Sequence, residues 1–240
     1  MRLKGRNVVV VGAGPGLGSA VIYLALKEGA SIYAFVRNAE VLERVRELSA
    51  YGPLHVGIHD FSRLEEAAKA AEEVKRHFST VHGLVVTAGG WIGGGVEELD
   101  ERSLEDMLSR NLKAHLYAVK AFLPLLAERS SVVLTSAVGG AYPLWLGNLA
   151  YTSSKAALAM AAQALAAELL GRNIRVNAVA PGGMTRDFSP GGASPLRLGA
   201  TQAPPEEVAK VIVWLLTDEA SWVTGAVIPV DGGRRLLGAL

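Results

Sequence analysis

The chain alternates short apolar runs with longer helix-forming stretches, and this alternation limits its fold more than any other feature. The first run, Val8–Val11, consists of four β-branched residues followed by glycine, which is typical of a parallel strand buried on both faces. Further strands are predicted at Ser31–Val36, Leu54–Ile58, Gly83–Val86, Val132–Thr135, Ile174–Ala178 and Ala226–Val230. Helices are predicted from Gly18 to about Glu28 and at Ala39–Ser49, Ser62–His77, Glu101–Glu128 (interrupted at Pro124), Ala150–Leu170 and Pro205–Leu216. Because the composition shows no break, we expect an α/β fold: one doubly wound domain over residues 1–240, with about seven parallel strands and helices on both faces.

Composition excludes several classes of function. Half of the residues are hydrophobic, which excludes a disordered chain, and 24 basic and 23 acidic residues are interspersed, which argues against nucleic acid as a partner. There is no cysteine, so disulfides and thiol nucleophiles are excluded. No apolar run is long enough for a membrane span or a signal-peptide core, so we expect a soluble, cytoplasmic protein without a membrane partner. No metal ligands are assigned, because His55 and His59 lie about 13 Å apart on a predicted strand at roughly 3.3 Å per residue.

Four glycines follow the first predicted strand. In Gly12-Ala13-Gly14-Pro15-Gly16-Leu17-Gly18, Leu17 stands where the common G-x-G-x-x-G pattern has its third glycine, whereas Gly12-x-x-x-Gly16-x-Gly18 fits. A strand–glycine–helix turn lets backbone N–H groups and the helix N-terminus hold a pyrophosphate. The loop therefore predicts dinucleotide binding, with a plain strand-to-helix turn as the alternative.

Arg37 follows the second predicted strand. An acidic residue at this place would bind the ribose 2′-OH of NAD, whereas arginine suits the 2′-phosphate of NADP. NADP(H) is therefore favoured over NAD(H). A solvated arginine at a helix start is the alternative.

Tyr151 and Lys155 are four residues apart in a predicted helix, so their side chains share one face. A cation close to the phenol favours the phenolate and would lower the pKa of Tyr151 from about 10. The pair predicts a general acid/base. Taken alone it is weak, because a buried tyrosine followed by an exposed lysine has the same spacing.

An ordered set of motifs spans nearly the whole chain, from Lys4 to Gly233. It comprises Gly12-x-x-x-Gly16-x-Gly18, Thr87-Ala88-Gly89, Asn111, Ser136, Tyr151-x-x-x-Lys155, Pro181-Gly182 and Val230-Asp231-Gly232-Gly233. In this order the chain resembles the short-chain dehydrogenases/reductases, and among them most closely the 3-oxoacyl-acyl-carrier-protein reductase type and related sugar and alcohol dehydrogenases. The resemblance implies a Rossmann fold and hydride transfer between nicotinamide and a carbonyl or alcohol carbon.

The resemblance also implies roles for single residues. Tyr151 would exchange a proton with the substrate oxygen, Lys155 would lower the pKa of Tyr151 and hold the nicotinamide ribose, Ser136 would hydrogen-bond the substrate oxygen, and Asn111 would support a water chain to Lys155. The implied cofactor contacts are the glycine loop with Gly12, Gly14, Pro15, Gly16, Leu17 and Gly18; Arg37; Asp60 and Phe61 at adenine; Thr87, Ala88 and Gly89 at the adenosine ribose; and Pro181, Gly182, Met184 and Thr185 at nicotinamide. Plain structural roles stay open for Ser136, Asn111 and Asp60, as a strand-end hydroxyl, a helix-surface amide and a cap.

Several positions depart from the family pattern. Val11 stands where threonine is usual and Thr87 where asparagine is usual, so two hydrogen bonds that brace the glycine loop are expected to be absent. Ser136 precedes Tyr151 by 15 residues, two more than usual, which implies a longer loop through Trp145 and Asn148. Thr185 comes one position early, and the substrate lid at about 183–205 is short. These departures put the substrate specificity in doubt.

Three functions compete. The first is an NADP-dependent oxidoreductase acting on a carbonyl or secondary alcohol, the second a non-catalytic nucleotide-binding sensor, and the third an enoyl reductase, whose pattern would require tyrosine at Asn148. Trp91 and Trp145 would line an apolar substrate pocket or pack in the core. Arg129 and Arg172 resemble a pair that docks acyl carrier protein, so the small-molecule substrate is carrier-linked or free; solvated surface arginines are the alternative.

The predicted helix Ala150–Leu170 is apolar nearly all round. Such a helix is buried on two sides, one against the sheet and one against a partner. Together with the resemblance, this predicts a homotetramer.

Overall fold

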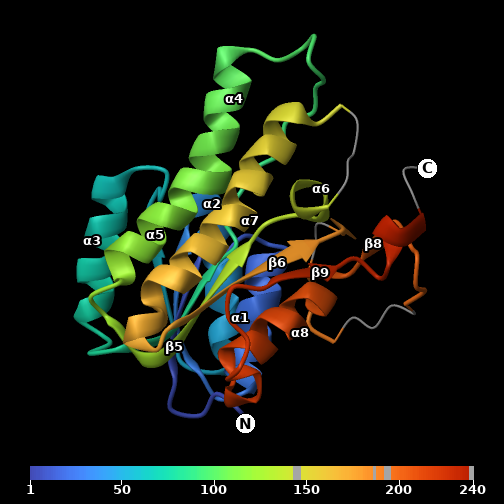
Figure 1. Cartoon of the computed structure of the whole chain (residues 1–240). Helices are drawn as coiled ribbons and strands as arrows, with labels where there is room; N and C mark the ends of the chain where they lie inside the picture. Colours follow the sequence, from blue (N-terminus) through green and yellow to red (C-terminus); the bar gives the residue numbers. More distant parts are fainter. Residues whose placement is uncertain (143–146, 186–187, 192–195, 238–240) are drawn as a thin grey trace.

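The computed structural model describes residues 1–142, 147–185, 188–191 and 196–237. Seven parallel strands form one sheet in the order β3-β2-β1-β4-β5-β6-β9. The strands are β1 (Asn7–Val11), β2 (Ser31–Val36), β3 (Leu54–Ile58), β4 (Val81–Val86), β5 (Leu126–Thr135), β6 (Arg175–Pro181) and β9 (Val227–Val230). The order reverses between β1 and β4, and such a switch point is where doubly wound sheets bind their ligands. The α/β, doubly wound fold expected from the sequence is confirmed (Figure 1).

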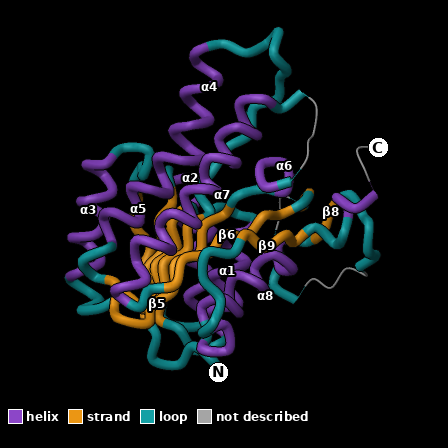
Figure 2. The backbone as a smooth tube through the Cα atoms, in the orientation of Figure 1, coloured by secondary structure: helices purple, strands orange, loops and turns teal. Residues whose placement is uncertain are grey.

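Two layers of helices cover the sheet (Figure 2). The helices are α1 (Leu17–Lys27), α2 (Ala39–Arg46), α3 (Leu64–Lys75), α4 (Glu101–Leu108), α5 (Ala114–Phe122), α6 (Val138–Ala141), α7 (Leu149–Leu169) and α8 (Pro205–Leu216). Residues of α3, α5 and α7 pack with Val9, Leu84 and Leu134 on one face of the sheet. Residues of α1 and α8 pack with Val10 and Val133 on the other. Neighbouring strand residues thus point to opposite, equally apolar faces, which is why the strand sequences are continuous valine runs.

The predicted helix Glu101–Glu128 extends six residues too far, because the helical region ends at Phe122. The capping box of Asp100 and Ser103 starts α4, and a π-helical turn at Ser109–Lys113 joins α4 to α5, which ends at Phe122. Pro124 follows two residues later and cannot donate a helical hydrogen bond. Strand β5 already begins at Leu126, six residues before the predicted start.

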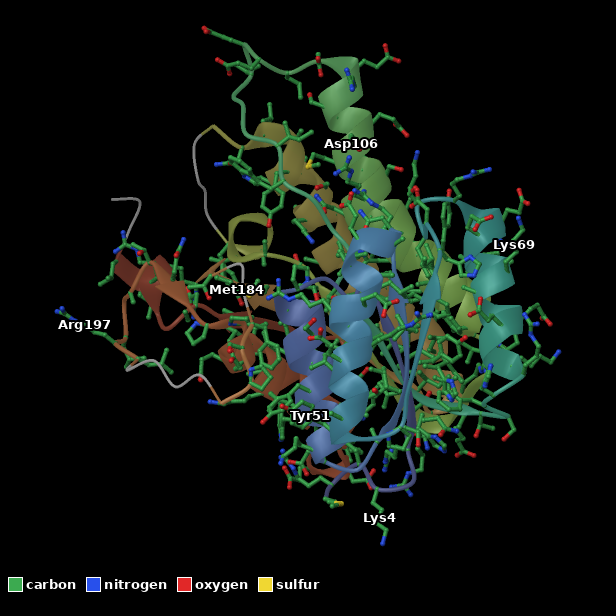
Figure 3. The ribbon with its side chains drawn as sticks, turned by 180° about the vertical axis from the view of Figure 1, so that it is seen from behind. Lys4, Tyr51, Lys69, Asp106, Met184 and Arg197 are labelled. Carbon is green, nitrogen blue, oxygen red and sulfur yellow. The ribbon has the colours of Figure 1, made fainter. Side chains whose placement is uncertain are left out.

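The region predicted as a lid contains two short strands, β7 (Gly183–Met184) and β8 (Gln202–Ala203), which pair in parallel. Residues 186–187 and 192–195 of this region lie outside the described residues, as does Trp145. In Figure 3, Asp106 on α4 lies at one end of the molecule and Lys4 at the other, with Met184 between them at the side of the molecule. No helix among the described residues is long and apolar enough to cross a membrane.

Candidate active site

The glycine loop after β1 is packed tightly on one side and open on the other. Gly12 has a φ of +86°, and a Cβ there would lie 2.3 Å from the backbone nitrogen of Ala88. A Cβ on Gly18, at the start of α1, would lie 2.7 Å from the Cα of Ala13. At Gly14 the nearest atom would be 3.9 Å away. Only glycine fits at Gly12 and Gly18, and the loop leaves space for a ligand beside Gly14.

Thr87 braces this loop. Its Oγ1 donates to the carbonyl oxygen of Gly12 at 2.8 Å and lies 3.3 Å from that of Val11. The expectation that the loop lacks a side-chain brace is therefore wrong at Thr87, because its hydroxyl reaches the backbone carbonyls at the end of β1.

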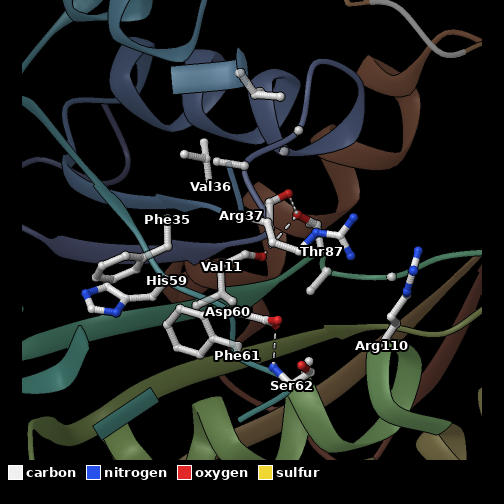
Figure 4. Close-up of a pocket in the computed structure, with 18 of the residues that line it drawn as sticks. Val11, Phe35, Val36, Arg37, His59, Asp60, Phe61, Ser62, Thr87 and Arg110 are labelled. Carbon is white, nitrogen blue, oxygen red and sulfur yellow. Dashed lines mark hydrogen bonds between the residues drawn. The ribbon is translucent and has the colours of Figure 1, made fainter. Parts of the chain in front are cut away.

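A cleft of about 330 Å³ lies along the carboxyl ends of β1, β2, β3 and β4 (Figure 4). Ten of the predicted cofactor residues line it: Gly12, Gly14, Leu17, Gly18, Arg37, Asp60, Phe61, Thr87, Ala88 and Gly89. Asp60 also accepts a hydrogen bond from the backbone N–H of Ser62 at 3.0 Å, which makes it a turn residue as well. The cleft has the size and the glycine-lined wall that the adenosine half of a dinucleotide needs.

Tyr151 and Lys155 lie on the first two turns of α7. Lys155 is 4% exposed, and its Nζ donates to the carbonyl oxygen of Thr135 at 2.8 Å. Burial lowers the pKa of Lys155 to about 7 and raises the pKa of Tyr151 to about 12. The lowered tyrosine pKa expected from the sequence is therefore not found, because burial disfavours the phenolate and also disfavours the charged form of the lysine.

Asn111 is fully buried and joins three segments. Its amide exchanges two hydrogen bonds with the backbone of Gly90, at 2.9 and 3.0 Å, and its Nδ2 donates to Ser154 Oγ at 3.0 Å. A Cβ on Gly89 would lie 2.9 Å from the Asn111 Oδ1 and 3.3 Å from the Lys155 Nζ. Asn111 therefore fixes the loop after β4 against α7, and Gly89 links the cleft to Lys155.

Ser136 is buried, and its hydroxyl donates to the backbone carbonyl of Lys155 at 2.8 Å. A hydroxyl has one hydrogen, so Ser136 cannot donate to a substrate oxygen while this bond is made. In this structure Ser136 has the plain structural role of fastening the end of β5 to α7. The substrate contact that the resemblance implies for Ser136 stays a prediction, and it requires this hydroxyl to turn away from the Lys155 carbonyl.

The residues expected at nicotinamide follow β6. Gly182 donates to the carbonyl of Val230 at 3.0 Å, and Thr185 to that of Ala203 at 3.1 Å. Pro181, Gly182, Met184 and Thr185 do not line the cleft described above, nor do Pro15 and Gly16. Phe188 is buried, and its N–H donates to the carbonyl of Pro15 at 3.1 Å, which ties the segment after β7 to the glycine loop.

Comparison with known proteins agrees with this geometry. Residues 12–235 match the family model described as enoyl-(acyl carrier protein) reductase. The chain is 32% identical to the 3-oxoacyl-(acyl-carrier-protein) reductase FabG of Thermotoga maritima, over 97% of this chain and 99% of that protein. The chain belongs to the short-chain dehydrogenase/reductase family. It is also 34% identical to carbonyl reductase family member 4 of Danio rerio, over 97% of this chain and 99% of that one.

Solved structures of this family have the same fold. A short-chain dehydrogenase/reductase from Serratia marcescens is 25% identical, with a TM-score of 0.89 over 98% of this chain and 99% of that one. One from Mycobacterium ulcerans is 28% identical, with a TM-score of 0.86 over 98% and 92% of the two chains. The protein is therefore an oxidoreductase enzyme of the short-chain dehydrogenase/reductase family.

In this family member, the loop after β4 is bound to the start of α7. Trp91 is 64% exposed and its Nε1 donates to the Asn148 Oδ1 at 2.7 Å, while Gly94 pairs with the backbone beside Asn148. Trp91 is therefore a surface residue near the start of α7 and does not pack in the core.

Sequence reasoning missed several residues that line the cleft. They are Val11, Ala13, Phe35, Val36, Asn38, Val41, His59, Ser62, Arg110 and Ala114. Arg110 had an available signal, because it immediately precedes Asn111. His59 had the same signal, because it immediately precedes Asp60; its two ring nitrogens lie 3.0 and 2.9 Å from the carboxylates of Glu66 and Glu73.

Proposed function

We propose that this short-chain dehydrogenase/reductase is NADP(H)-dependent and interconverts a carbonyl group and a secondary alcohol in a small-molecule substrate. One observation carries the proposal: Tyr151 and Lys155 are packed one helical turn apart, and Lys155 adjoins Gly89, a residue of the dinucleotide cleft. A proton-exchanging phenol next to a nicotinamide cofactor is the arrangement that this reaction needs.

The residues present fit the cofactor. The loop is open at Gly14, where a pyrophosphate would bind, and closed at Gly12 and Gly18. Arg37 is exposed at the cleft and carries the charge that a 2′-phosphate requires. When bound, NADP(H) would supply or accept the hydride.

Tyr151 is the proposed proton donor in reduction and acceptor in oxidation. Its phenol is neutral in the ligand-free protein, because burial raises its pKa to about 12. Lys155 would hold the nicotinamide ribose, and its ammonium form would favour the phenolate of Tyr151. Asn111 and Ser136 act by holding the loop after β4 and the end of β5 against α7.

The enoyl reductase alternative is less favoured, although the matching family model carries that description. The position that would need tyrosine is Asn148, and its Oδ1 already accepts the indole N–H of Trp91.

We propose that residues 183–205 form the substrate lid. The hydrogen bond from the Phe188 N–H to the Pro15 carbonyl, which ties this segment to the glycine loop, supports the proposal.

The proposed substrate is a free small molecule, not one attached to an acyl carrier protein. The Nη2 of Arg172 donates to the carbonyl oxygen of Leu123 at 3.0 Å, so this side chain is already used within the fold. Arg172 also comes 21 residues after Tyr151, about 30 Å along the helix at 1.5 Å per residue. A carrier protein docked at Arg129 and Arg172 would lie at the C-terminal end of α7, whereas Tyr151 of the same subunit lies at the N-terminal end.

Replacing the proposed acid tests the function. Tyr151→Phe removes the exchangeable proton and keeps the ring, so turnover of a reducible carbonyl should fall about 10²–10⁴-fold, while NADPH binding stays unchanged. The control Tyr51→Phe alters a tyrosine at the other end of the molecule and should keep parent turnover (Figure 3). Near-parent turnover in Tyr151→Phe, with NADPH still bound, would refute the proposal.

A further inference from the structure

Two arginines border the cofactor cleft, and they come from different elements. Arg37 follows β2, whereas Arg110 lies on the π-helical turn Ser109–Lys113, immediately before Asn111. Figure 4 shows both side chains at the same end of the cleft, one from each wall. The dinucleotide contacts expected from the sequence do not include Arg110.

The stem of Arg110 is held in place and its tip is not. The Nε donates to the Asp106 Oδ1 at 2.7 Å, one turn earlier on α4. The stem also packs against the loop after β4, since a Cβ on Gly90 would lie 2.9 Å from the Arg110 Cδ. No described residue pairs with the two Nη groups, so the donors that point away from Asp106 are available to a ligand.

The charges around the cleft favour an anionic ligand at this end. Among the described residues that line it, Arg37 and Arg110 are cations, and Asp60 is the carboxylate, one oxygen of which accepts from the Ser62 N–H. The pair of Arg110 with Asp106 is partly exposed, and such pairs are weak. Guanidinium groups approaching from two sides suit a phosphate dianion, whose three oxygens accept hydrogen bonds in different directions.

We propose that Arg110 is a second determinant of 2′-phosphate recognition, acting from the wall of the cleft opposite Arg37. The inference rests on the proposed NADP(H) dependence and extends it to a residue on the turn that also carries Asn111.

Binding of two cofactor fragments, 2′,5′-ADP and 5′-AMP, tests this without any turnover. The parent should bind 2′,5′-ADP more tightly than 5′-AMP. Arg110→Gln should weaken the binding of 2′,5′-ADP about tenfold, which corresponds to the loss of one charge-assisted hydrogen bond. The affinity for 5′-AMP should stay within about twofold of that of the parent. Arg37→Gln should do the same, and the unchanged affinity for 5′-AMP shows that each variant is folded.

Two further variants separate the local contact from net charge. Lys113→Gln removes a cation from the same turn, one that pairs with Glu105 and does not line the cleft, so it should bind both fragments like the parent. Asp106→Asn removes the negative charge opposite Arg110 and keeps an oxygen that can accept from its Nε, so 2′,5′-ADP should bind at least as tightly as to the parent.

Three results would overturn the inference. One is an Arg110→Gln variant that binds both fragments like the parent. Another is equal weakening of both fragments, which would place Arg110 against the adenine ring. The third, a parent that does not distinguish the two fragments, would remove the proposed cofactor as well, and is thereby distinguishable from a failure of Arg110 alone.

Discussion

Burial acts in opposite directions on the two titrating side chains of the site. It lowers the pKa of Lys155 to about 7 and raises the pKa of Tyr151 to about 12. His115, fully buried next to Lys155, has a pKa well below its usual value and stays neutral over the same range. Between pH 7 and 10, Lys155 is therefore the one of these three groups that changes its charge.

This gives a pH dependence of stability with a defined sign. Above pH 7 the folded protein loses the Lys155 proton while the unfolded chain keeps it up to about pH 10.5. The unfolded state then binds more protons, so the free energy of unfolding rises with pH from about 7 toward 10. At about 1.36 kcal/mol per pKa unit, the rise is at most about 3–4 kcal/mol. Below pH 7 the full cost of burying the ammonium is present.

Denaturant unfolding of the parent and of Lys155→Met at pH 7 and pH 9.5 checks this. From pH 7 to pH 9.5, the free energy of unfolding of the parent should increase relative to that of Lys155→Met, because methionine has no proton to lose. A difference that is the same at both pH values would contradict the assigned burial of the ammonium.

The residues of the site differ in how far the sequence could predict them. That Tyr151 and Lys155 share one face of α7 follows from helical spacing, which is local, whereas their proposed role depended on the whole ordered set of motifs. The partners of Ser136 and Thr87 could not be predicted, because a hydroxyl bonds whichever carbonyl the tertiary packing brings near. For Ser136 that carbonyl belongs to Lys155, and for Thr87 it belongs to Gly12.

At the scale of elements, the sequence predicted which segments are strands better than where they begin. All seven strands of the sheet were expected, because buried parallel strands are continuous apolar runs. The start of β5 was missed because its first residues include the charged Glu128 and Arg129 and so do not form an apolar run. Their strand conformation depends on pairing with the neighbouring strand, where Leu126 pairs with Val81 and Ser131 with Gly83 of β4. The short helix α6 was missed as well, because four residues rich in glycine carry no periodicity.

The glycine loop gives a prediction at the same scale. Gly12→Ala should lower the free energy of unfolding by several kcal/mol, of the order of severe core substitutions, because its Cβ would lie 2.3 Å from backbone at a φ of +86°. Gly14→Ala places a Cβ no closer than 3.9 Å to any neighbouring atom, an ordinary van der Waals contact, so stability should change by less than about 1 kcal/mol. Thermal unfolding without cofactor measures both.

Cofactor binding completes the comparison. Gly14→Ala should weaken the binding of NADPH although the variant keeps the stability of the parent, since the methyl group occupies the space beside the loop. Equal stabilities for the two variants would mean that the contact between Gly12 and Ala88 does not constrain the loop.

For the whole molecule, the outer face of α7 is the surface predicted to pack against another subunit. Ala156, Met160, Ala164 and Ala167 are exposed there at intervals of three and four residues, and Met160 is 64% exposed. The inner face packs on the sheet through residues such as Leu158 and Ala162. The helix is therefore apolar on both sides, as the sequence indicated, and one of these sides is covered within the chain.

The predicted homotetramer buries this outer face between subunits. Light scattering of the parent at micromolar concentration should give four times the 25.2 kDa of the chain. Ala164→Glu places a charge in the middle of the face, and its desolvation in a tight interface should reduce the assembly to smaller species. Ala68→Glu puts the same substitution on an exposed alanine of α3 and should leave the mass unchanged. A monomeric parent, or an Ala164→Glu variant with the parent mass, would show that α7 does not mediate assembly.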